Sequence, residues 1–399
     1  MTLSLQIKQL GFFSAVIAPA AVYVSLAAGS GNPVRCHENV CEYTPEYLLI
    51  SMVLVFFAPF TRQFVQLKGR LLVLAFLSVA LLMYAQVSSM PAFVYGKVFG
   101  GLISSAFILV FAGHLLKTGG VDGFANSIAR VMLIVLILTI AYKSRGDLLD
   151  RDVSYLFNGP IVFGWLMGFG ALCAVNLMLE HQSWRWAIGA LALTGGVFWS
   201  GSKGPILAYF LAVLFLFVSS GKYFRKLILQ SFLVGIILIL AAYQLDLYSL
   251  LNETRFGLLL QIANDGVDIT EGSVGVRASS YAEALELIGQ NLPLGIGPGN
   301  FALYNPTLMY PHNVHLEILL EYGLIPFLVY VAAIVYALAR SGSLFRAIIL
   351  FFLICMTFSG DASYLRFLLP FILLCTVANP QSQWRQPIAR QHSVSTFQL

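Results

Sequence analysis

Residues 311–338 read PHNVHLEILLEYGLIPFLVYVAAIVYAL, an apolar run that follows a long polar stretch at 245–311. The run is long enough to cross a membrane, and because lipid offers no hydrogen bonds to the backbone, it is expected to be helical. His312 stands at its start, so a group that titrates near neutral pH lies where a water-exposed segment enters the membrane. This boundary determines the fold class and supplies the first candidate site.

The composition indicates an all-α polytopic membrane protein that forms one compact domain. Of the 399 residues, 59% are hydrophobic and only 10% are charged, whereas soluble domains carry about 25% charged residues. The first apolar run is expected to be a retained span, because its core is long for a signal peptide. The apolar runs predict twelve spans, at about 10–28, 47–60, 71–88, 93–116, 123–142, 160–179, 184–200, 204–219, 227–245, 313–338, 344–358 and 364–378.

Four parts of the chain follow from these spans. We expect residues 1–244 to hold helices one to nine and residues 245–311 to form one large outer loop. Residues 312–378 are expected to hold helices ten to twelve, and residues 379–399 to form a cytoplasmic tail.

The charges predict the orientation of the chain. If both termini are cytoplasmic, all carboxylates except those of Asp122 and Glu180 fall on or near the outer side. The inner links and tail then receive most of the basic residues, as the positive-inside rule requires: Lys8, Arg62, Lys68, Arg70, Lys117, Arg185, Lys222, Arg225, Lys226, Arg340, Arg346, Arg385 and Arg390.

Cys36 and Cys41 lie in the first outer loop, where an oxidising exterior would favour a local disulfide. Two free thiols are the alternative, and the sequence leaves the choice open. Cys173, Cys355 and Cys375 fall in apolar spans and are expected to be small core residues.

The large outer loop is expected to contain two short helices. Residues 247–263 and 276–290 carry apolar residues at helical spacing. The stretch Gly295-Ile-Gly-Pro-Gly-Asn300 follows, and it cannot continue a regular helix. It resembles phosphate-binding loops only loosely, since Pro298 lacks a donor. We interpret it as a sharp turn that places Asn300 near the start of the tenth span.

The first candidate site is His312 with its neighbours. Asn313 is a favourable N-cap residue, and Glu317 and Glu321 are four residues apart, so they share a helix face. Histidine can take a proton from a sugar hydroxyl. One alternative is an interfacial histidine bonded to backbone, and another is a metal site formed with His315.

Three cations on the outer side are candidate phosphate contacts. Lys203 precedes Pro205, which suits the first turn of a helix, and free N–H groups there attract anions. Arg255 and Arg277 stand on the two predicted loop helices, and arginine binds phosphate through two parallel N–H bonds. Alternatively, Lys203 extends to water and the arginines pair with loop carboxylates. Arg366 in the last span could likewise contact an anionic group or pair with Asp361, and pairing is the simpler expectation.

Together these motifs resemble the bacterial O-antigen ligase and O-antigen polymerase family. His312-Asn313 is followed by nine residues and then Gly323, as in the family pattern, although Pro326 replaces the usual Gly, Thr or Tyr. The stretch 295–301 resembles the family's Gly-Val-Gly-x-Gly-Asn-Phe, and Ser202-Lys203-Gly204 resembles its Ser-Arg-Gly motif with lysine replacing arginine. Arg277 resembles the loop arginine that precedes the glycine turn.

The resemblance implies a C-type glycosyltransferase fold and an enzyme of the bacterial inner membrane whose active site faces the periplasm. Its donor would be a glycan on undecaprenyl pyrophosphate and its acceptor lipid A–core, with no metal, cofactor or nucleic acid involved. His312 and Arg277 would be catalytic, and the substrate-binding residues would be Lys203, Arg255, Asn300, Asn313 and Glu317.

Two other functions stay open at this point. A polymerase that extends the lipid-linked glycan would share the same motifs. A lipid or glycan transporter belongs to a different class, but transporters tend to place polar residues at the membrane midplane and to show repeated halves, which this sequence does not.

Overall fold

The computed structural model describes residues 16–27, 34–37, 40–43, 92–144, 159–220, 272–305, 308 and 310–377. Several predicted segments lie outside these residues: the spans 47–60, 71–88 and 227–245, the loop helix 247–263 with Arg255, and the tail 379–399.

The described part of the chain is helical apart from one hairpin. Strands β1 (Val34–His37) and β2 (Val40–Tyr43) pair antiparallel, and this register sets Cys36 opposite Cys41. The helices are α2 (Ala18–Ala27), α5 (Ala92–Lys143), α6 (Pro160–His181), α7 (Trp184–Trp199), α8 (Lys203–Ser220), α12 (Gly272–Asn291), α13 (Phe301–Tyr304), α14 (Val314–Glu317), α15 (Leu324–Arg340), α16 (Ser343–Phe358) and α17 (Leu369–Val377). A π-helical turn covers Ile318–Tyr322 and a 3-10 helix covers Ala362–Phe367.

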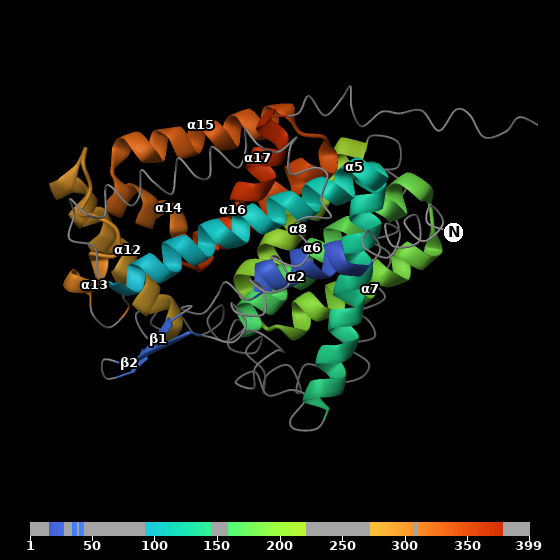
Figure 1. Cartoon of the computed structure of the whole chain (residues 1–399), viewed down its shortest axis with the longest axis horizontal. Helices are drawn as coiled ribbons and strands as arrows, with labels where there is room; N and C mark the ends of the chain where they lie inside the picture. Colours follow the sequence, from blue (N-terminus) through green and yellow to red (C-terminus); the bar gives the residue numbers. More distant parts are fainter. Residues whose placement is uncertain are drawn as a thin grey trace, which may run out of the picture.

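The helix α5 has two arms that meet at a kink (Figure 1). Gly120 forms the kink with φ 64° and ψ −163°, a conformation that glycine adopts without the steric cost of a side chain. The two arms cover the residues of the predicted spans 93–116 and 123–142, and the kink falls in the link predicted between them.

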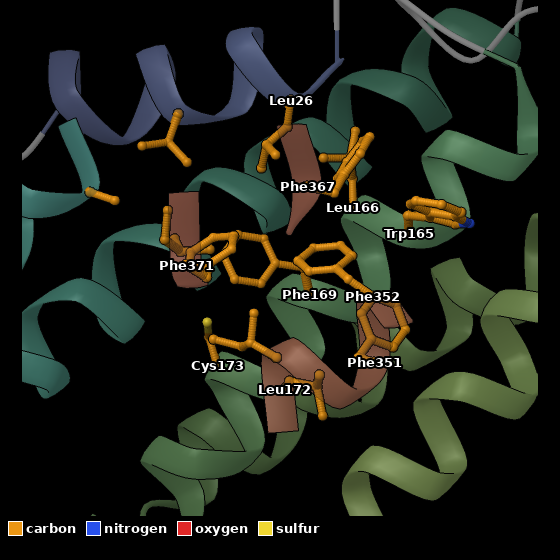
Figure 2. Close-up of a cluster of buried hydrophobic side chains, with 14 of the residues drawn as sticks. Leu26, Trp165, Leu166, Phe169, Leu172, Cys173, Phe351, Phe352, Phe367 and Phe371 are labelled. Carbon is orange, nitrogen blue, oxygen red and sulfur yellow. The ribbon is translucent and has the colours of Figure 1, made fainter. Parts of the chain in front are cut away.

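Aromatic side chains from distant parts of the chain form the core (Figure 2). The ring of Phe169 on α6 lies 5.6 Å from that of Phe352 on α16 and 5.5 Å from that of Phe371 on α17. A Cβ added to Gly168 would lie 2.5 Å from the ring of Phe351. Glycine therefore lets α6 and α16 approach closely, as small residues do between membrane helices.

The predicted span 313–338 is not one continuous helix. The chain passes from α14 through the π-helical turn, breaks at Gly323 with φ 85°, and begins again as α15. A Cβ at Gly323 would lie 2.4 Å from the carbonyl oxygen of Pro293, so the break makes room for the glycine turn of the outer loop. The expectation of one continuous helix over 313–338 was wrong, because an apolar pattern carries no information about this distant contact.

The described helices fit a membrane protein. Two are long and apolar enough to cross a bilayer, Gly101–Lys143 and Pro160–His181, and five shorter apolar helices accompany them: Ala18–Ala27, Lys203–Ser219, Leu324–Arg340, Ser343–Phe358 and Ala362–Cys375. The total of twelve spans stays a prediction. The elements α12, α13 and α14 lie together at one end of the molecule, beside the start of α15 (Figure 1).

Candidate functional site

His312 has an unusual backbone conformation, and its neighbours stabilise it. Its φ of 57° lies in the left-handed region, which costs a residue other than glycine about 1 kcal/mol or more. Asn313 follows in an extended conformation, and its side-chain oxygen accepts hydrogen bonds from the backbone N–H groups of His315 (3.0 Å) and Leu316 (3.1 Å). The predicted N-cap role of Asn313 is therefore confirmed. The ring of His312 lies 4.4 Å from that of Tyr310.

Helix α12 is hydrogen-bonded to the C-terminal end of α16, where the helix carbonyls lack intrahelical partners. Arg277 Nη1 donates to the carbonyl oxygen of Phe358 at 3.0 Å. Tyr281, one turn further along the same face, donates to the carbonyl oxygen of Thr357 at 2.9 Å and lies 3.4 Å from that of His312. These contacts bring Arg277 and the backbone of His312 to the same end of α16.

The Ser-Lys-Gly motif, at the start of α8, also lies at the C-terminal end of α16. Helix α8 begins at Lys203, whose side chain is exposed. A Cβ added to Gly204 would lie 3.0 Å from the Cβ of Phe358, so the start of α8 packs directly on the residue that Arg277 binds. Lys203, Arg277 and His312, far apart in the sequence, thus belong to elements that meet at the end of α16.

Two tyrosine hydroxyls in this region are held in their neutral form. Burial raises the pKa of Tyr310 to about 12, with Asp361 and Glu317 adding to the rise and Arg277 opposing it. Burial also raises the pKa of Tyr281, again against the effect of Arg277. The pKa of Tyr310 is therefore influenced by one cation and two carboxylates, those of Asp361 and Glu317.

The glycine turn binds one of the chain's own carboxylates. Glu321, only 1% exposed, accepts hydrogen bonds from the N–H groups of Gly299 (2.8 Å) and Phe301 (3.5 Å). The side-chain nitrogen of Asn300 donates to the carbonyl oxygen of Ile296 at 2.7 Å, within the turn itself. These contacts give the turn a structural role: it is fixed against the segment that follows His312.

The surroundings of His315 do not fit the metal-site alternative. Its Nε2 lies 3.0 Å from the carbonyl oxygen of Leu353 and its Nδ1 lies 3.0 Å from the hydroxyl of Tyr330. A carbonyl can only accept, so Nε2 carries the proton and Nδ1 accepts from Tyr330. Both ring nitrogens are therefore engaged with protein groups. Within the described residues, no group of three or more His, Cys, Asp or Glu residues could hold a metal ion.

Arg366 and Asp361 are connected through Ser363. The hydroxyl of Ser363 donates to Asp361 Oδ1 at 2.5 Å and accepts from Arg366 Nη1 at 3.3 Å. Arg366 Nε also donates to the carbonyl oxygen of Leu26, at the end of α2. The buried Arg366 thus joins the first described helix to the 3-10 helix, which favours a structural role for it.

Sequence reasoning missed Tyr281 and Tyr310. The spacing from Arg277 to Tyr281 is one helical turn, so their shared face was a usable signal. For Tyr310, two residues before His312, the sequence held no comparable signal. Arg255 lies outside the described residues, so its predicted contact with phosphate stays a prediction.

A family model described as O-antigen ligase matches residues 188–331. The matched segment begins in α7 and ends in α15, so it contains Lys203, Arg277, His312 and the glycine turn. The search of curated proteins found no match to the chain. The match covers about a third of the chain and supports the family resemblance carried by the motifs.

Proposed function

We propose that this protein transfers an O-antigen glycan from undecaprenyl pyrophosphate to lipid A–core at the periplasmic face of the inner membrane. The match to the O-antigen ligase family supports a ligase-type glycosyltransferase that acts on lipid-linked glycans. The observation that carries the finer proposal is the meeting of Arg277, His312 and the start of α8 at one end of α16.

The cations would stabilise the leaving group. As the bond between the anomeric carbon and the diphosphate breaks, the diphosphate takes the electron pair, and fixed positive charge stabilises it. Arg277 bonds a neutral carbonyl in this structure, and a phosphate oxygen would be a stronger partner for its guanidinium. Lys203, exposed at the start of α8, would supply a second positive charge, and Arg255 a third.

His312 would activate the acceptor. The acceptor hydroxyl oxygen forms the new bond to the anomeric carbon, and the imidazole takes the hydroxyl proton. Glu317 would orient the imidazole or the acceptor, while Asn313 and Asn300 would hold the backbone on either side of the site. The left-handed backbone of His312 supports the proposal, because such strain persists mainly where function requires it. The proposed chemistry uses no metal ion.

A complementation experiment in cells that lack the gene tests this function. We expect His312→Ala and Arg277→Ala to abolish surface glycan attachment, with lipid-linked polymer accumulating and membrane levels of the protein unchanged. Arg340→Ala is the matched control, since Arg340 is exposed at the far end of α15. Normal attachment by either site variant would contradict the proposed roles. Glycans stalled at one repeat unit would instead identify a polymerase.

A further inference from the structure

Helix α15 is too short to cross the hydrocarbon layer alone. Its 17 residues run from Leu324 to Arg340. At 1.5 Å per residue it spans about 25 Å, whereas the hydrocarbon core is about 30 Å thick. In the predicted orientation Arg340 lies at the cytoplasmic surface, where its charge stays in water. Leu324 therefore lies within the outer edge of the hydrocarbon layer, and any tilt of the helix places it deeper.

The segment Leu292–Leu294, which leads into the glycine turn at residues 295–300, lies at the same depth in the membrane as Leu324. The N–H of Leu324 donates to the carbonyl oxygen of Pro293 at 2.9 Å, which holds the segment Leu292–Leu294 beside the start of α15. The side chains here are apolar and exposed: Leu294 is 76% exposed, Ile325 is 70% exposed and Leu292 is 44% exposed. We name these three residues the outer apolar rim. They continue the exposed apolar face of α15 formed by Leu328 and Val329.

Three N–H groups of the turn beside the rim are bonded within the protein. The N–H of Leu292 donates to the carbonyl of Ile288, that of Gly295 to the carbonyl of Asn291, and that of Ile296 to the carbonyl of Leu320. Pro293 has no N–H group. Irregular backbone is tolerated at membrane depth only where its polar groups are bonded within the protein, and these hydrogen bonds fit that condition.

We propose that the outer apolar rim is embedded in the acyl chains of the surrounding bilayer. The helix α12, which carries Arg277 near its start, would then be fixed to the membrane at its other end, and the site would stay at a constant height above the lipid tails. A polar loop that only covers the site from the water side would not need three exposed apolar side chains at this position. This inference does not depend on the proposed transferase activity.

Fluorescence quenching in nanodiscs tests the proposal. The full-length chain with Cys36→Ser and Cys41→Ser is a suitable background, since Cys173, Cys355 and Cys375 are buried. An environment-sensitive label is attached at Leu294→Cys, or at Glu286→Cys as the control. Glu286 is exposed on α12, eight residues earlier.

We expect the label at position 294 to emit at shorter wavelength than the label at 286. We also expect lipids brominated on their acyl chains to quench it at least threefold more strongly. Equal, water-like emission at both positions would overturn the proposal. Short-wavelength emission that brominated lipids do not quench would also overturn it, because protein, such as a second copy of the chain, would then cover the rim.

Discussion

Asn313 links the start of α14 to the backbone of His312. Its side-chain oxygen accepts hydrogen bonds from the backbone N–H groups of His315 and Leu316. Loss of such a cap costs about 0.5–2 kcal/mol. We expect Asn313→Ala to lower the thermal unfolding midpoint, measured by circular dichroism in detergent, while Asn313→Asp retains it. Equal midpoints for the parent and the alanine variant would show that the cap is unimportant.

Glu321 holds the glycine turn with its carboxylate. In Glu321→Gln an amide NH₂ replaces one of the two accepting oxygens, so one buried N–H group loses its partner. The cost is about 1–3 kcal/mol. Glu286→Gln is the matched control, because Glu286 is exposed, and its effect should stay within about 0.5 kcal/mol. Equal free energies of unfolding for Glu321→Gln and Glu286→Gln would contradict the role given to Glu321.

Lys203 differs from the arginine of the family motif in geometry but not in charge. Because lysine provides a point charge rather than two parallel donors, we expect Lys203→Arg to retain glycan transfer. Lys203→Met should lower the transfer rate about tenfold, or ~1.4 kcal/mol in the barrier. The side chain is exposed, so both variants should fold normally. Unchanged transfer by the methionine variant would remove Lys203 from the site.

At the scale of single elements, Gly323 determines where α14 and its π-helical turn end and α15 begins. It combines φ 85° with a backbone contact that leaves no space for a side chain. We expect Gly323→Ala to prevent stable folding or to lower the unfolding midpoint by roughly 4 °C or more. This estimate follows from a cost of about 3 kcal/mol or more.

Gly289→Ala is the control for Gly323→Ala. Gly289 is helical, lies in α12, and has open space where its Cβ would be. Alanine there should stabilise the protein slightly, by about 0.5–1 kcal/mol. Similar midpoints for the two alanine variants would show that the break at Gly323 is not sterically required.

The sequence predicted the elements that depend on local patterns. The helix start at Asn313 and the helix over 276–290 both follow from residues close together in the chain. The break at Gly323 was missed because its cause, the carbonyl of Pro293, lies 30 residues earlier. Contacts between distant segments leave no trace in hydropathy or spacing.

The same distinction applies to the candidate site. The motifs correctly selected residues whose elements meet, since Arg277 and the start of α8 both contact Phe358. The spacing of Tyr281 from Arg277 was a usable signal, whereas the contact of Tyr310 with His312 became visible only in three dimensions. Glu317 and Glu321 were predicted to share a face, but Glu321 binds the glycine turn, a partner that helical spacing alone could not identify.

At the scale of the whole molecule, the end of α16 is the meeting point of the outer loop, α8 and the segment that leads into α15. The exposed apolar surfaces of α5, α8 and α15 fit a bilayer around these helices. With the predicted orientation and the proposed embedding of the apolar rim, the site would lie just above the lipid tails. The proposed glycan transfer requires this height, because only there would a lipid-linked diphosphate meet Arg277 and His312 together.

Glycan transfer by the purified protein in nanodiscs tests the central claim most directly. The donor is an undecaprenyl-pyrophosphate-linked glycan, the acceptor is lipid A–core, and a chelator removes divalent metals. We predict transfer by the parent and by Arg340→Ala, and a loss of at least a hundredfold for His312→Ala and for Arg277→Ala. Transfer by either site variant at the parent rate would contradict the account.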